Sequence, residues 1–119
     1  MGYERKLYVI EKGITKGLCG KIYGMHVAAF EMGRVDEMVE MIKKYPYTNT
    51  FFFADDGNTE VTSDAYGEPL TEIPVKDMAN IIRELSKQDV YRRYKPVLAF
   101  LDTIDESEWH NIVVLHYGH

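Results

Sequence analysis

The sequence predicts an α+β fold in which helices pack on one face of a mostly antiparallel sheet. Two segments, residues 35–45 and 74–87, repeat apolar residues at helical spacing. Several short runs are rich in β-branched and aromatic residues and end at Gly, Pro or Asp. The expected order of elements is β-β-α-β-β-α-α-β, and a chain of 119 residues is expected to form one domain, residues 1–119.

The chain is predicted to begin with an antiparallel β-hairpin. Residues 5–12 contain the β-forming run Leu-Tyr-Val-Ile, and Gly13 ends it. Residues 21–32 alternate loosely and predict a longer second strand, with Gly24 as a candidate bulge. The helix at 35–45 follows, with acidic residues in its first turns and lysines in its last, as the helix dipole prefers.

Three consecutive phenylalanines place residues 50–54 in a central strand, because both faces of such a strand need cover. The Asp-Asp-Gly-Asn sequence at 55–58 is typical of a turn, and 59–62 is expected to return as a short strand. Residues 63–72 are predicted to be irregular.

Two helical segments and a buried strand are predicted for the C-terminal half. Pro74 suits the first turn of the helix that runs to about residue 87, and Asp89 is a candidate cap of a further helical segment. A helix is expected at 97–104, just after Pro96. Residues 111–117 form an apolar run, which we expect to share one sheet with residues 50–54. The expected core contains Val9, Val27, Val39, Ile42, Phe52, Ile82, Leu85, Leu101 and Val113.

The composition argues against several classes of protein. With 45% hydrophobic and 28% charged residues, the chain has the profile of a folded protein. No apolar run approaches the length that spans a bilayer, so no membrane partner is expected. The single cysteine, Cys19, favours a reducing cytoplasm. The net charge of −5 disfavours nucleic acid as a partner, despite a basic and aromatic cluster at 91–95.

The candidate catalytic and metal-binding residues form no recognisable motif. On an extended strand His110 and His116 lie about 20 Å apart, and His119 approaches His116 only if the chain turns back. The acidic turn at 55–60 has its glycine too early for a calcium loop, and Cys19 lacks the surroundings of a nucleophile. We therefore expect no catalytic residue, no metal ligand and no cofactor. Metal binding by the C-terminal histidines stays open, as does a small metal-dependent or histidine-based hydrolase built around His26, His110 or His116.

The strongest functional signal is an acidic stretch, residues 48–75. It carries six acidic residues and no Lys or Arg. An electrostatic field of one sign affects the rate of association and the choice of partner more than it affects the fold. We predict that the hairpin in this stretch contacts a basic surface of another protein, with nearby tyrosines as anchors. The alternative is a merely solvated surface. The predicted contact residues are Asp55, Asp56, Glu60, Asp64 and Tyr66.

The chain resembles small uncharacterised proteins of bacteriophages and mobile elements. The resemblance spans the whole chain and rests on the segments KLYVIEK (6–12), ADDGNTE (54–60) and VVLHYGH (113–119). It implies an accessory protein that binds or inhibits a host protein, and it carries no functional residues across. A structural, self-assembling subunit, such as a homodimer formed through an uncovered sheet edge, is a further hypothesis.

Overall fold

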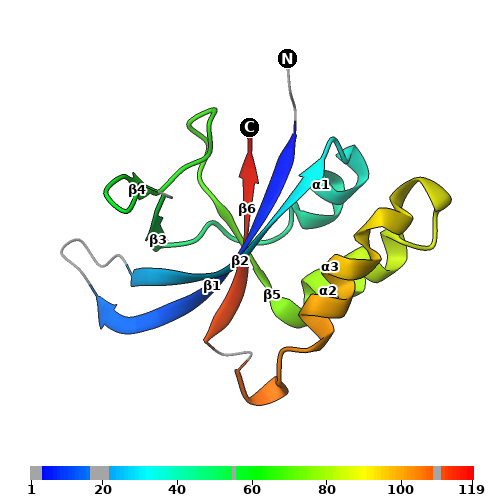
Figure 1. The fold of residues 1–119 in the computed structure, drawn as a ribbon. Helices are drawn as coiled ribbons and strands as arrows, with labels where there is room; N and C mark the ends of the chain where they lie inside the picture. The colour runs from blue at the N-terminus through cyan, green and yellow to red at the C-terminus, as the bar shows by residue number, and fades with distance from the viewer. Residues whose placement is uncertain (1–3, 17–21, 55, 109–110) are drawn as a thin grey trace.

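The computed structural model describes the chain except for residues 1–3, 17–21, 55 and 109–110 (Figure 1). The described residues form a curled sheet with the strand order β4-β3-β2-β1-β6-β5, together with α-helices and short 3₁₀ helices. The predicted α+β class is confirmed. The elements in chain order are β1 (Arg5–Lys16), β2 (Ile22–Gly33), α1 (Asp36–Ile42), β3 (Thr50–Phe53), β4 (Glu60–Val61), β5 (Thr71–Pro74), α2 (Val75–Leu85), η2 (Asp89–Tyr94), α3 (Lys95–Asp102), η3 (Glu106–Glu108) and β6 (Ile112–Gly118).

The sheet is mixed, because one of its pairs is parallel. β1 lies at the centre and pairs antiparallel with β2 on one side and with β6 on the other. β2 and β3 run parallel, and β3 continues into an antiparallel pair with β4. The predicted first hairpin, the β3–β4 hairpin and the presence of the 50–54 and 111–117 runs in one sheet are confirmed.

Alternating side chains of the central strands build two cores. Leu7 and Val9 of β1 belong to the core shared with α1, α2 and α3, whereas Ile10 belongs to a smaller core on the other face with Phe52. The helices lie together on one side of the sheet (Figure 1). Seven of the nine predicted core residues are buried: Val9, Ile42, Phe52, Ile82, Leu85, Leu101 and Val113.

Val27 and Val39 were predicted in the core, and the structure corrects both. Val9 pairs with Ala28 and Ile10 with His26, so Val27 is the extra residue of a β-bulge and is 44% exposed. Val39 is half-buried. Gly24 itself pairs with Lys12, and further irregularities in the register lie between Arg5 and Lys6 and between Lys12 and Lys16. Glycine is needed at position 24 for another reason, because a Cβ there would lie 2.3 Å from the Ile10 side chain.

The strand β5 was not predicted, because residues 63–72 were expected to be irregular. Thr71 pairs with His116 and Ile73 with Val114, which makes β5 the edge strand beside β6. Pro74 ends this strand and directly precedes α2, instead of lying within the first helical turn. Prolines are tolerated at such edge positions because they need not donate to the ladder.

The remaining boundaries differ from the predictions by a few residues. α1 and α2 each end earlier than expected, at Ile42 and Leu85. α3 begins at Lys95 and contains Pro96 in its first turn, as expected from the fixed φ of proline. Asp89 is the first residue of the 3₁₀ helix η2 and does not cap it. In the part of the chain that the structure describes, no helix has the length and apolar character needed to cross a membrane.

Candidate functional site

The acidic stretch forms two loops on the side of the sheet away from α2 and α3 (Figure 1). The first loop, residues 54–59, joins β3 to β4, and the second, residues 62–70, joins β4 to β5. We call their polar surface the acidic loop face, which consists of Asp56, Glu60, Asp64, Tyr66 and Glu68. The structure therefore places Asp56, Asp64 and Tyr66 on these two loops, and Glu60 on the short strand β4 between them. The fifth predicted contact residue, Asp55, lies outside the described residues.

Asp56 closes the first loop. One of its carboxylate oxygens accepts the backbone N–H groups of Asn58 at 2.8 Å and Thr59 at 2.9 Å, and the other accepts the Thr59 hydroxyl at 2.6 Å. The hydroxyl and backbone hydrogen bonds from Thr59, followed by that from Asn58, lower the pKa of Asp56 to about 2. Gly57 supplies the positive φ of 73° that the turn requires. Asp56 thus contributes charge to the surface while its oxygens hold the loop.

Asp64 closes the second loop in the same way. Its Oδ1 accepts the N–H groups of Tyr66 at 2.9 Å and Glu68 at 3.0 Å, and its own N–H donates to the Glu68 carbonyl at 2.8 Å. Gly67 takes the positive φ of 80° within the loop. The Tyr66 side chain is 51% exposed, as expected of an aromatic anchor. Both loops are therefore defined by local hydrogen bonds to an aspartate.

Glu72 counted toward the acidic stretch, but it does not belong to the exposed surface. Its carboxylate forms an ion pair with Lys12 at 2.8 Å and accepts the Thr48 hydroxyl at 2.6 Å. Both charged side chains are about three-quarters buried, with exposed fractions of 22% for Lys12 and 23% for Glu72. The pair ties β1 to β5 across the sheet. The charge that faces solvent is therefore smaller than the sequence suggested, and among the described residues of the stretch it lies mainly at Asp56, Glu60 and Glu68, which are exposed.

A hollow of about 580 Å³ lies beside the second loop. Tyr47, at its rim, is 67% exposed. The hollow is bounded by the end of α1, residues 45–47, the second loop and the adjoining ends of the central strands. Its charged and polar lining residues are Arg5, Lys43, Tyr45, Tyr47, Asp64, Glu68, Thr71 and His116.

His116 is the most perturbed of the described histidines. It is 9% exposed, and its Nε2 atom is buried without a hydrogen-bond partner among the described residues. Burial first and the Arg5 guanidinium second lower the pKa of His116 to about 4, while Asp64 opposes the shift. The ring is therefore neutral at pH 7. Sequence reasoning considered His116 as a metal ligand or base, and it missed Arg5, which is distant in sequence.

Of the other sequence-derived candidates, His26 shows no catalytic arrangement with the described residues around it. The His26 ring packs at 5.3 Å from the ring of Tyr8 and at 4.8 Å from that of Phe52, which indicates a packing role on β2. Cys19 and His110 lie outside the described residues. Within the described residues, His119 lies near Glu4 and Glu31, a grouping that histidine spacing did not predict.

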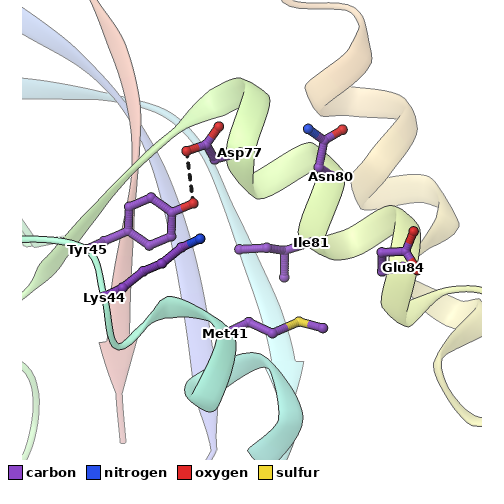
Figure 2. A pocket seen from close by; sticks show the side chains of 7 residues that line it. All are labelled: Met41, Lys44, Tyr45, Asp77, Asn80, Ile81 and Glu84. Atoms are coloured by element: carbon purple, nitrogen blue, oxygen red, sulfur yellow. Dashed lines mark hydrogen bonds between the residues drawn. The ribbon is translucent and has the colours of Figure 1, made fainter.

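A second hollow, of about 450 Å³, lies between α1 and α2 (Figure 2). The Tyr45 hydroxyl donates to Asp77 at 2.9 Å, and burial followed by this carboxylate raises the pKa of Tyr45. Asn80 accepts a hydrogen bond from Arg83, and Glu84 pairs with Lys87. These polar groups at the second hollow thus form hydrogen bonds or ion pairs with neighbouring side chains, as is typical of a helix surface.

Comparisons of the chain with protein-family models, with curated proteins and with solved structures find no match. The acidic loop face and the hollow beside it form the candidate functional region of the described residues. Two features distinguish this region. Its loops are closed by their own aspartates, and exposed tyrosines stand next to exposed carboxylates.

Proposed function

We propose that this protein is a small, non-enzymatic binding or inhibitor protein whose acidic loop face contacts a basic surface of a partner protein. One observation carries the proposal. Asp56 closes its loop through both carboxylate oxygens and Asp64 closes its loop through Oδ1, so Glu60, Glu68 and Tyr66 project from a surface that is already shaped. A shaped surface loses less conformational entropy when a partner binds.

The charges and the tyrosines have different roles in this proposal. Exposed carboxylates such as Glu60 and Glu68 speed association with a basic partner and make it sensitive to salt. Tyrosine side chains bury large area at low entropic cost, and Tyr66 and Tyr47 are exposed at 51% and 67%. The carboxylates therefore set the rate of encounter, and the tyrosines hold the complex once it has formed.

The hollow offers a place for one long cationic side chain of the partner. Glu68 and the ring of Tyr47 both line it, and they supply a carboxylate and an aromatic face for a lysine or arginine. Arg5 and Lys43 line the same hollow. The partner's remaining basic groups therefore face Asp56 and Glu60, away from these two cations.

The resemblance to bacteriophage and mobile-element proteins makes a host protein the natural partner in this proposal. A reducing cytoplasm, which the single cysteine favours, is the corresponding location. The alternative of a histidine-based hydrolase is less well supported, because the Nε2 atom of His116 is buried and has no hydrogen-bond partner among the described residues. Its pKa of about 4 also makes the ring a weak base, far from the operating pH that suits a general base.

The test is affinity capture from a lysate of the source cells with three forms of the protein. The second form carries Glu60→Lys and Glu68→Lys. The third carries Glu106→Lys and Glu108→Lys, a matched charge reversal on the exposed residues of η3. Capture is compared by quantitative mass spectrometry at ionic strengths of about 0.1 M and about 1 M, where charges are screened over about 10 Å and about 3 Å.

We expect a basic protein to be captured at the lower salt by the natural protein and by the η3 variant. The loop variant should capture about tenfold less of it, which corresponds to a loss of about 1.4 kcal/mol. Equal capture by all three forms would show that the acidic loop face is only a solvated surface. Equal loss in both variants would show that net charge, and not this face, governs binding.

A further inference from the structure

We propose that Glu4, Glu31 and His119 form a surface site for a divalent transition-metal ion, with Zn²⁺ as the natural occupant. One ligand atom from each of these residues can be chosen so that all three lie within 4.8 Å of one another. Two carboxylates and one imidazole are ligands that Zn²⁺ accepts, and water can complete the coordination shell. The site is separate from the acidic loop face and does not depend on the proposed function.

The three ligands lie at one end of three neighbouring strands: Glu31 near the end of β2, Glu4 one residue before β1, and His119 one residue after β6. Glu4 and His119 exchange both backbone hydrogen bonds, each at 2.9 Å, and so extend the antiparallel pairing of β1 with β6 by one residue pair. Residues paired in this way present their side chains on the same face. Lys6 lies two residues after Glu4 and pairs with Glu31 on β2, which brings Glu31 to that face as well.

The two oxygens of Glu31 have different partners. Oε1 lies 3.3 Å from the Lys6 ammonium, and Oε2 lies 3.1 Å from Nε2 of His119. Two ligand atoms on a tetrahedral ion with bonds of about 2 Å are separated by about 3.3 Å. The His119–Glu31 contact is therefore already near the spacing that an ion requires. Lys6 acts as the group that orients the Glu31 carboxylate, as outer partners do in metal sites.

Glu4 must close the remaining distance. Because Glu31 and His119 are already 3.1 Å apart, the wider separations in the group involve the Glu4 carboxylate. Glu4 is exposed, so its side chain can change rotamer without disturbing the core. The Tyr117 ring, 6.0 Å from the ring of His119, limits the positions of the imidazole. The backbone thus fixes two ligands and leaves the third adjustable.

The site should bind its ion reversibly and not hold it as a permanent structural centre. It offers three protein ligands where structural zinc sites have four, and the Lys6 ammonium nearby opposes the positive ion. We therefore expect an affinity in the micromolar range. This proposal departs from the expectation from the sequence that the chain has no metal ligand.

The experiment is a titration of the untagged protein with ZnCl₂. Binding is measured by isothermal titration calorimetry and by changes in the amide NMR spectrum of the ¹⁵N-labelled chain. We expect one Zn²⁺ per chain, with shifts confined to residues around Glu4, Glu31 and His119. His119→Ala and Glu31→Gln should each weaken binding at least about tenfold. His26→Ala serves as the control, because His26 is an exposed histidine on β2 outside the site, and it should leave the affinity unchanged.

Two outcomes would overturn the site. One is the absence of saturable Zn²⁺ binding by the natural protein. The other is binding that keeps its full affinity in His119→Ala or in Glu31→Gln. Thermal unfolding of each variant establishes that it is folded, which is expected because Glu31 is exposed and His119 lies at the end of the last strand. The variant with Glu60→Lys and Glu68→Lys should bind Zn²⁺ normally, so failure of this site and failure of the proposed function can be told apart.

Discussion

Two hydrogen bonds join Asp64 and Glu68. The Glu68 N–H donates to Oδ1 of Asp64 at 3.0 Å, and the Asp64 N–H donates to the Glu68 carbonyl at 2.8 Å. A carboxylate that the sequence assigned to partner contact therefore has a structural role in its own loop. Within the acidic stretch, Asp56 and Asp64 therefore shape the loops, whereas Glu60 and Glu68 face solvent.

Removal of the Asp64 side chain should destabilise the second loop. Asp64→Ala leaves the N–H groups of Tyr66 and Glu68 without their charged acceptor, and we expect a loss of about 1–2 kcal/mol in the free energy of unfolding. Urea denaturation measures this loss. Glu68→Ala is the matched control, because it removes an exposed carboxylate and keeps the backbone bonds, so it should change stability by less than about 0.5 kcal/mol. Equal stability of Asp64→Ala and the natural protein would refute the loop-closing role.

The buried His116 should make stability depend on pH. Its pKa is lowered from 6.5 to about 4 in the folded protein, so the unfolded chain binds more protons between these values. The contribution of the neutral His116 ring to the free energy of unfolding is therefore fully present above pH 6.5 and is lost as the pH falls toward 4. A shift of this size corresponds to about 3 kcal/mol.

Replacement of His116 by leucine isolates this contribution. Urea unfolding of the natural protein and of His116→Leu at pH 7 and pH 4 should show a smaller acid-induced loss in the variant, by about 3 kcal/mol. The other titratable groups should contribute equally to the pH dependence of stability in both proteins, so their contributions cancel in the comparison. The same acid-induced loss in His116→Leu as in the natural protein would contradict a neutral, buried ring.

Periodicity and turn chemistry were sufficient to predict much of the fold. The stripe from Val75 to Leu85 predicted α2, and its buried residues are those at helical spacing. The aliphatic run of β6 predicted a buried strand, which lies beside the central strand β1. These elements are predictable because each has enough apolar residues to reveal the face that it buries.

The missed features depend on neighbours that are distant in the sequence. In β5 only Ile73 is buried, so the strand has no alternation of its own and exists because it pairs with β6. Val27 looks like a core residue, but the register with β1 makes it the exposed residue of a bulge. Local sequence contains no signal for either outcome, since both are set by the partner strand.

The candidate site was predictable only in part. The Asp-Gly pattern at 56–57 predicted a turn, and the structure has one there. The turn at 64–67 was not predicted, because residues 63–72 were expected to be irregular. Which carboxylates face solvent could not be predicted, because Glu72 is neutralised by Lys12, sixty residues away. The grouping of His119 with Glu31 likewise results from strand order, which brings together residues 88 positions apart.

The central claim is that a partner docks on the acidic loop face, and site-specific photo-crosslinking tests it most directly. Tyr66 is replaced by the photo-reactive amino acid p-benzoylphenylalanine in one form of the protein. In a control form Val90, which is 63% exposed on η2, is replaced instead. After irradiation in a lysate of the source cells, the form substituted at residue 66 should crosslink to a basic protein, and the form substituted at residue 90 should not. Crosslinking to the same protein from residue 90 alone, or from neither position, would contradict the account.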